Sequence, residues 1–202
     1  MFHDEGSIRI PDLVHTATFP IYGLINNSLG FSVRSVSQGN IGEPPKLYSI
    51  GFTFSREISP GTMGYFKIGS STKQQMIVYN SEISSHTSLD HRFSMDTIVF
   101  EQYQLPDAVR RQAGNPHTTK GEFVIDSTVF TGKIHSWSQP YQISWFLLEH
   151  ERMIFSGSIF GFSENMLIQL LQELVIISHR DEVLERYQQE LDQASTMRDI
   201  YS

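Results

Sequence analysis

The stretch YQISWFLLEHERMIFSGSIFGFSENMLIQLLQELVII, residues 141–177, decides the fold because it joins two strand patterns to one helix pattern. Apolar residues alternate with a period of two from Tyr141 to Leu148, which predicts a strand covered on both faces. The charged residues 149–152 predict a turn, and the run from Met153 to Ser156 predicts the second strand of an antiparallel hairpin. We expect Gly157 and Gly161 to break the chain after it.

A helix is expected to follow this hairpin at once. The Ser163 hydroxyl can accept a hydrogen bond from the free N–H groups of a first helical turn. Phe162 before it and Leu167 after it have the spacing of a hydrophobic staple. The apolar residues beyond Ser163 recur at three- and four-residue spacing, which is typical of a helix that lies on a sheet. They are Met166, Leu167, Leu170, Leu171, Leu174 and Val175.

Further strands are predicted by apolar or alternating runs bounded by glycine, proline, asparagine or serine. These runs are Phe19 to Leu24, Phe31 to Val36, Leu47 to Phe54, Tyr65 to Ile68, Met76 to Tyr79, Thr97 to Tyr103 and Phe123 to Ile134. The run from Leu47 has the clearest alternation, with Tyr48, Ile50, Phe52 and Phe54 on one face. Gly39 to Pro45 is expected to be a loop, and Leu105 to Lys120 an irregular, mobile segment.

Together these patterns predict an α+β fold: a mainly antiparallel twisted β-sheet with one or two C-terminal helices packed on it. Ser178 and Asp181 have the spacing of a capping pair for the last helix. Its narrow apolar stripe consists of Val183, Leu184, Tyr187, Leu191 and Ala194. We expect this otherwise polar helix to pack at an edge or against a second copy. The predicted organisation is a single α+β domain over residues 1–180, then a polar C-terminal helix and frayed tail over 181–202.

Composition narrows the functional classes. The formal net charge is −7, and Arg110 and Arg111 are the only adjacent basic pair, which argues against binding of a nucleic-acid backbone. The absence of cysteine excludes disulfides and thiolate metal sites. The N-terminal sequence shows neither a signal peptide nor a membrane span. We therefore expect a cytoplasmic protein if the sequence is complete, and an envelope or extracellular protein if a leader or anchor was trimmed.

Short motifs in the chain resemble catalytic elements, but their context favours ordinary turns. Ser70 to Lys73 matches the Ser-x-x-Lys pattern of penicillin-recognising enzymes, yet it lies between predicted strands and does not open a helix, so we discard it. His86-Thr87-Ser88 and His117-Thr118-Thr119 resemble the His-x-Thr/Ser elements of two-histidine phosphoesterases, in which paired imidazoles act as acid and base. A phosphodiester hydrolase that uses His86 and His117 is therefore retained as an alternative function.

Other candidate sites are weighed against ordinary structural roles. The groups with metal-ligand side chains are His86, Asp90, His91 and Asp96, and Glu149, His150 and Glu151. Neighbours on a strand or turn point apart, so these groups predict no metal site. We predict no cofactor and no catalytic residues. Trp137, Tyr141 and Trp145 are the candidates for an aromatic ligand-binding site, although indoles more often supply buried core area.

Two blocks of the sequence resemble a known family. They are FPIYGLINNSLGFSVRSVSQGNIGEPPKLYSIGFTFS, from residue 19, and ISWFLLEHERMIFSGSIFGFSENMLIQLLQEL, from residue 143. The order of four features in these blocks resembles that of a family of bacterial domains of unknown function from Gram-positive envelope and sigma-factor-regulating proteins. The features are Phe19-Pro20, Ile143-Ser144-Trp145, Phe155-Ser156-Gly157 and the Ser163 helix. The resemblance implies a large curved antiparallel sheet with a helix packed on it, shaped like a lipoprotein-carrier domain, and it assigns no catalytic residues.

The sequence thus favours a non-catalytic function over an enzymatic one. We expect a binding or regulatory domain whose curved sheet and C-terminal helix present a surface to a protein partner or a small apolar ligand. Besides the hydrolase, the remaining alternative is a structural homodimer formed through the helix at Val183 to Ala194.

Overall fold

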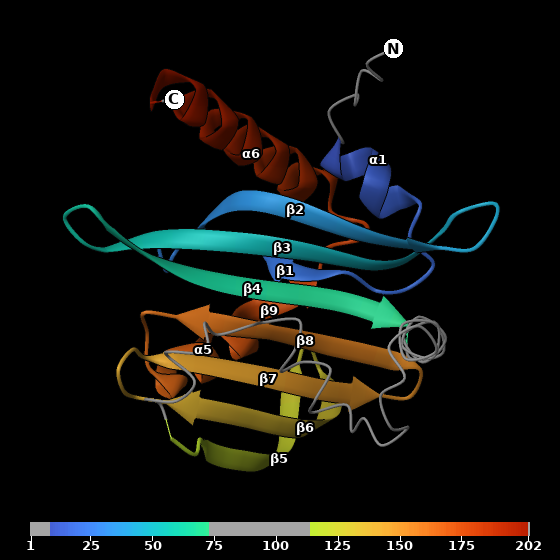
Figure 1. Cartoon of the computed structure of the whole chain (residues 1–202). Coiled ribbons are helices and arrows are strands. Elements are labelled where there is room, and N and C mark those ends of the chain that lie inside the picture. Colours follow the sequence, from blue (N-terminus) through green and yellow to red (C-terminus); the bar gives the residue numbers. More distant parts are fainter. Residues whose placement is uncertain (1–8, 73–113, 202) are drawn as a thin grey trace.

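The computed structural model of the protein describes residues 9–72 and 114–201, and a long antiparallel sheet runs through their centre (Figure 1). Its strand order is β2-β3-β4-β8-β7-β6-β5, and all neighbours are antiparallel. The strands are β2 Ser32–Ile41, β3 Lys46–Ser59, β4 Thr62–Thr72, β5 His117–Ile125, β6 Thr128–Trp137, β7 Ile143–His150 and β8 Met153–Phe160. The predicted α+β class with a mainly antiparallel sheet and C-terminal helices is confirmed.

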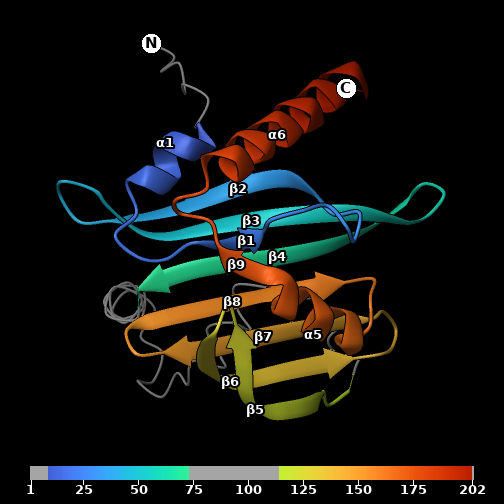
Figure 2. The same cartoon turned by 180° about the vertical axis from the view of Figure 1, so that it is seen from behind.

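The remaining elements cover one face of this sheet, which we call the inner face (Figure 2). They are helix α1 Ile10–His15, strand β1 Tyr22–Leu24, helix α5 Glu164–Glu173, strand β9 Leu174–Ile176 and helix α6 Asp181–Tyr201. Strands β1 and β9 pair antiparallel as a separate small sheet. Helix α6 packs on β2 and α1, and α5 packs on β5 and β7. The opposite side of the seven-stranded sheet is called the outer face.

One continuous core fills the space under the inner face. The rings of Phe54, Phe66, Phe130, Phe146 and Phe155 are at most 1% exposed and belong to the same hydrophobic cluster as the buried leucines of α5. Val183, Leu184 and Tyr187 of α6 belong to this cluster too. Each such side chain contributes roughly 1.5–3 kcal/mol through removal of apolar surface from water. The predicted stripe of the last helix is therefore packed against the protein's own sheet.

The hairpin of β7 and β8 forms as predicted but is longer. Glu149 and His150 continue the ladder opposite Ile154 and Met153, and the turn consists of the two residues 151 and 152. The predicted break at Gly157 is wrong, because residue 157 lies within β8. A Cβ atom there would lie 1.9 Å from the Lys67 carbonyl oxygen and 2.8 Å from the Phe146 ring. Glycine is therefore what allows β8 to lie this close to its neighbours.

Helix α5 begins where the sequence predicted. The Ser163 hydroxyl accepts a hydrogen bond from the Met166 N–H at 3.4 Å. The helix ends earlier than its apolar stripe suggested, since Leu174 and Val175 lie in β9 opposite Leu24 and Gly23. The backbone at Leu174 is extended, at φ −74° and ψ 139°, while its N–H still donates to the Leu171 carbonyl oxygen. The helix therefore ends at this residue and the chain continues into β9.

Three other boundaries differ from the predictions. Residues 39–41, expected in a loop, continue β2, and the turn is confined to 42–45, where both prolines stand. The run from 123 to 134 is two strands, because Asp126 and Ser127 adopt φ values of 46° and 64° and form a tight hairpin turn. The Asp126 carboxylate accepts a hydrogen bond from the Ile176 N–H at 2.9 Å, which ties the tip of this hairpin to β9.

The predicted capping pair of the last helix is wrong. The Ser178 hydroxyl accepts a hydrogen bond from the Ile21 N–H at 2.9 Å, and Asp181 faces His15 at 3.2 Å. Both side chains therefore tie the C-terminal segment to the N-terminal one. The strand candidates at 76–79 and 97–103, and most of the irregular segment from 105, lie outside the described residues.

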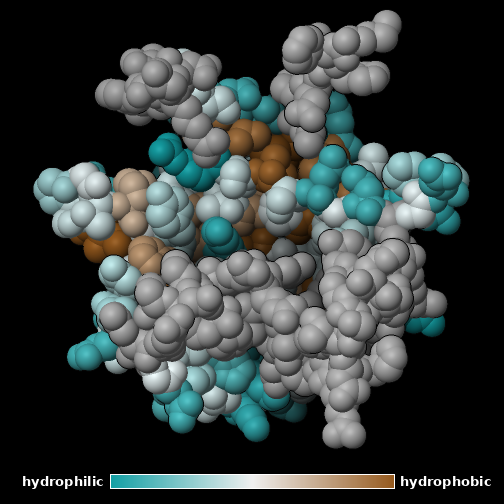
Figure 3. Space-filling view, viewed as in Figure 1, coloured by the Kyte–Doolittle hydropathy of each residue, from teal (hydrophilic) through white to brown (hydrophobic). Residues whose placement is uncertain are grey.

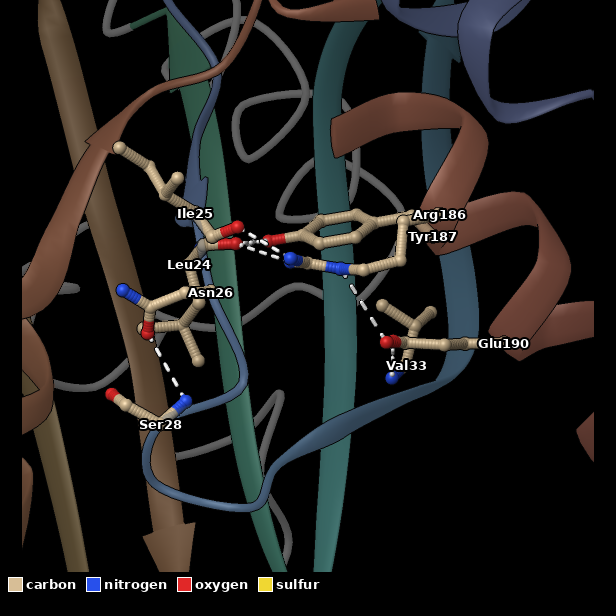
Figure 4. Close-up of polar contacts among 8 residues, drawn as sticks. All are labelled: Leu24, Ile25, Asn26, Ser28, Val33, Arg186, Tyr187 and Glu190. Carbon is tan, nitrogen blue, oxygen red and sulfur yellow. Dashed lines mark hydrogen bonds and ion pairs between the residues drawn. The ribbon is translucent and has the colours of Figure 1, made fainter. Parts of the chain in front are cut away.

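Helix α6 is anchored by a polar clamp on β1 and β2 (Figure 4). Arg186 donates to the carbonyl oxygens of Leu24, at 2.8 Å, and Ile25. The Glu190 carboxylate accepts from the Val33 N–H at 2.7 Å and lies 3.5 Å from Arg186 Nε, a charge contact whose geometry falls short of a hydrogen bond. Because Val33 lies on the edge strand β2, α6 closes this edge of the sheet.

Candidate functional site

The outer face of the sheet has a polar half and an apolar half. The outer positions of β2, β3 and β4 are mostly small or hydroxylated: Ser35, Ser37, Ser49, Gly51, Thr53, Gly69 and Ser71. The outer positions of β6, β7 and β8 include five apolar side chains that are at most 8% exposed: Trp137, Ile143, Trp145, Leu147 and Ile154. These residues do not belong to the inner-face core, so the sheet buries apolar groups on both sides.

An aromatic row crosses the outer face at one end of the sheet. Its aromatic members are Tyr65, Phe160, Trp137 and Tyr141. Tyr65, Phe160, Ile143 and Trp137 are successive cross-strand partners on β4, β8, β7 and β6, so the aliphatic Ile143 fills the place between Phe160 and Trp137. The rings of Tyr141 and Phe160 lie 5.8 Å apart and are the exposed members, at 52% and 38%. Hydrophobic surface is visible at this end of the sheet, by the β3–β4 hairpin, on the left of Figure 3.

The three aromatic residues predicted as ligand-binding candidates all lie on this face but do not form one site. The rings of Trp137 and Trp145 meet edge to face at 5.2 Å, and both indoles are buried. Trp137 Nε1 donates to the Gly114 carbonyl oxygen at 3.1 Å. The indoles are therefore a packed pair, while Tyr141 contacts Phe160 and stays accessible.

A groove of about 340 Å³ lies on the polar half of the outer face. Its lining includes outer-face side chains and glycines of four strands: Ser37, Ser49, Gly51, Thr53, Lys67, Gly69, Ser71 and Ser156. Among the described residues that line it, Lys67 alone carries a charge, and its side chain is exposed. Lys67 is two residues after Tyr65 on the same face of β4, about 7 Å along the strand. The groove thus adjoins the aromatic row.

Tyr48 lines one end of this groove and not the core, contrary to the predicted alternation. The pairing of β2 with β3 shifts between Gly39, opposite Ser49, and Asn40, opposite Leu47, so Tyr48 is the extra residue of a bulge. A Cβ atom at Gly39 would lie 2.4 Å from the Tyr48 ring, which places that ring over the glycine. Ile50, Phe52 and Phe54 do face the core as predicted.

A second polar cluster joins α5 to β5 at the rim of the inner face. Glu164 accepts hydrogen bonds from Thr119 Oγ1 at 2.7 Å and from Ser136, and lies 3.4 Å from His117 Nδ1. Burial by itself raises the pKa of this carboxyl, but the hydrogen bonds of Ser136, Thr119 and His117 outweigh it and lower the pKa. Glu164 is therefore an ionised anchor of the helix.

This cluster bears on the two-histidine alternative. His117 is 76% exposed and its Nδ1 faces Glu164, while His86 lies outside the described residues. The convergence of two imidazoles therefore stays a prediction. Ser70 faces the inner side and accepts from the Tyr22 N–H at 3.4 Å, which is a structural role.

The part of the chain that the structure describes contains no group of three metal-ligand side chains. Of the two groups of metal-ligand side chains that the sequence analysis weighed and set aside, the one from His86 to Asp96 lies outside the described residues. In the other, His150 Nδ1 lies 2.9 Å from the Val129 carbonyl oxygen and Nε2 lies 3.9 Å from Glu151. His150 therefore links the turn of the β7–β8 hairpin to the start of β6.

Comparison with family models, curated proteins and solved structures finds no match to this chain. Within residues 9–72 and 114–201, no helix is long and apolar enough to cross a membrane. The fold therefore defines the class, an α+β domain built on one antiparallel sheet, and the outer face carries the argument about function.

Proposed function

We propose that this protein is a non-catalytic binding domain that holds a protein partner on the outer face of its sheet, at the aromatic row. The observation that carries the proposal is the exposed pair of Tyr141 and Phe160. Protein interfaces are enriched in tyrosine and phenylalanine, and their rings anchor partners at low cost in conformational entropy. The polar groove with Lys67 lies beside this pair and adds hydrogen-bonding groups.

The packed core supports binding at the surface over binding of an apolar ligand inside the fold. Leu167 and Leu170 of α5 are fully buried in the cluster that also contains Phe130 and Phe155. A carrier domain needs an open space between its sheet and its helix, and here aromatic and leucine side chains occupy that position. The exposed rings lie on the opposite face.

The groups on this face specify the chemistry of the partner. An apolar side chain of the partner would pack on Tyr141 and Phe160, and an acidic side chain would lie near Lys67. The serine and threonine hydroxyls of the groove offer donors and acceptors to main-chain groups. We therefore propose an extended partner segment in which a large apolar residue lies close to an aspartate or glutamate.

Selection of binders from a displayed library of random peptides tests this proposal directly. We expect selected peptides to combine a large apolar residue with an acidic one and to shift the NMR signals of Tyr141, Phe160 and Lys67. Phe160→Ala should weaken the binding of these peptides about 30-fold, as expected for loss of a central anchor worth about 2 kcal/mol. Lys67→Gln should weaken it less, with a smaller salt dependence.

Val129→Ala is the matched control, since Val129 is 45% exposed on another part of the sheet and its truncation should leave peptide affinity unchanged. The proposal fails if the selected peptides bind Phe160→Ala as tightly as the wild-type protein, or if the signal shifts map to another surface.

A further inference from the structure

Among the described strands, β5 leaves one edge of the seven-stranded sheet unpaired. In the strand order it is the last member, and among the described elements only β6 pairs with it. Most of its residues are exposed, with Thr119 and Phe123 half-buried and Ile125 buried. The opposite edge is closed by α6 through the hydrogen bond from Val33 to Glu190. An edge with free N–H and C=O groups is a template for another strand.

The sequence of β5 is complementary to itself. If two copies pair antiparallel with residue 121 of each opposite the other, Lys120 of one copy lies opposite Glu122 of the second, and the pair occurs twice. Moving the register by two residues puts Lys120 opposite Lys120, or Glu122 opposite Glu122. Opposite charges directly across a strand pair stabilise it, and like charges destabilise it. The charges therefore select one register.

The other side chains fit this register. Lys120 and Glu122 share the outer face with Thr118 and Val124, so the pairing places Thr118 opposite Val124 of the second copy. Val124 is 58% exposed in the single chain and would gain cover. Gly121 lies at the centre, where a Cβ atom would meet nothing within 4 Å. In this register, residues that lie opposite each other point to the same side, so the outer faces of the two sheets form one continuous face.

The position of Lys120 gives a further reason for an acidic partner. Within its own chain Lys120 lies opposite Lys133 of β6, a like-charge neighbour. Lys120 and Glu122 are both exposed, and no described residue forms an ion pair with either of them. We propose that the β5 edge binds the β5 edge of a second copy of this chain, with Lys120 and Glu122 exchanged across a two-fold axis at Gly121. Tyr141 and Phe160 lie outside β5, so this pairing does not depend on the proposed partner site.

Sedimentation equilibrium of the full chain tests the pairing. We expect the wild-type chain to associate to a dimer as its concentration rises. In the Lys120→Glu variant, both cross-strand pairs of the dimer would consist of two acidic side chains. In the Glu122→Lys variant, both pairs would consist of two basic ones. Each single variant should raise the dimer dissociation constant at least about tenfold. The double variant Lys120→Glu/Glu122→Lys restores both pairs within one chain type, and should dimerise like the wild type.

An equimolar mixture of the two single variants should also dimerise, because it brings opposite charges together in both pairs. Circular dichroism should be the same for all variants, since both side chains are exposed. A wild-type chain that stays monomeric, single variants that dimerise like the wild type, or a mixture that stays dissociated would each overturn the proposal. Glu182→Lys on α6 is the matched charge reversal away from β5. Unchanged dimerisation of this variant supports pairing at the β5 edge. Lost dimerisation would place the second copy on α6 and overturn the proposal.

Discussion

The hydroxyl group of Tyr187, on α6, makes two hydrogen bonds to the backbone of Leu24, on β1. The phenolic oxygen accepts from the Leu24 N–H at 2.7 Å and donates to the Leu24 carbonyl oxygen at 2.9 Å. The approach is close because residue 23 is glycine: a Cβ atom there would lie 2.5 Å from the same oxygen. A tyrosine near the end of the chain is thus fitted to a glycine near its beginning. Burial raises the pKa of Tyr187, so the hydroxyl keeps its proton.

Tyr187→Phe should lower the free energy of unfolding by about 1–3 kcal/mol. The Leu24 carbonyl oxygen keeps its hydrogen bond from Arg186, but the Leu24 N–H loses the acceptor in a buried position. Urea unfolding measures the change. Tyr141→Phe removes a hydroxyl from an exposed ring and should change nothing, so equal stability of the two variants would contradict the role of the Tyr187 hydroxyl.

Gly157→Ala should destabilise the fold by at least about 2 kcal/mol, because the added methyl group collides with the Lys67 carbonyl oxygen and the Phe146 ring. Gly121→Ala adds the same group where nothing lies within 4 Å and should change stability by less than about 0.5 kcal/mol. Thermal unfolding of the pair checks the difference. Similar melting temperatures of the Gly157→Ala and Gly121→Ala variants would contradict the prediction and would mean that β8 can move away from β4.

Glu164→Gln should lower stability at neutral pH by about 1–2 kcal/mol, since a charged acceptor of several hydrogen bonds becomes a neutral one. The pKa of Glu164 is lower in the folded state than in the unfolded chain. Its contribution is therefore complete above the unfolded value, about 4.3, and is lost as pH falls through the folded value.

Unfolding measured from neutral pH into the acid range should consequently show a shallower acid loss in Glu164→Gln than in the wild type. Glu173→Gln, at the exposed end of the same helix, is the control and should keep the wild-type profile. Two identical profiles for Glu164→Gln and the wild type would refute the anchoring role.

Glu190→Ala should open the closed edge of the sheet. The Val33 N–H then has no carboxylate acceptor, and Arg186 loses its charge contact. We expect faster hydrogen exchange at Val33 and a loss of about 1–3 kcal/mol in stability. Gln189→Ala, at an exposed neighbouring position of α6, should leave exchange at Val33 as it was. Unchanged protection of Val33 in Glu190→Ala would show that another group covers this edge.

The local patterns predicted elements well where one short-range signal was sufficient. Ser163 begins its helix because a hydroxyl cap acts within one turn. The alternation of Ile50, Phe52 and Phe54 predicted an inner face that the structure confirms. Gly157 was misjudged because its role depends on Phe146 and Lys67, which approach it only in the assembled sheet. The end of α5 was missed for the same reason, since β9 exists only through β1.

The candidate site was predicted in part. Tyr141, Trp137 and Trp145 were singled out from composition, and all lie on the outer face. Phe160 and Tyr65 were not, because cross-strand register places them opposite each other and no periodicity within one strand encodes register. The alternation of Tyr65 and Lys67 with Phe66 and Ile68 was a usable signal that β4 has an outer face of its own. Tyr48 was misplaced because a bulge shifts the alternation by one residue.

Two sets of contacts limit how early this domain can fold during synthesis. They are the pairing of β1 with β9 and the hydrogen bonds of α6 to Leu24 and Val33. Strand β1 emerges first but gains its partners only after β9 and α6 have been synthesised, so the core of this domain stays unfinished until α6 emerges. Contacts between such distant segments slow folding and leave apolar surface open in the meantime. A ribosome that stalls before the codons of α6 would therefore release a chain with its β2 edge uncovered, a substrate for chaperones and proteases.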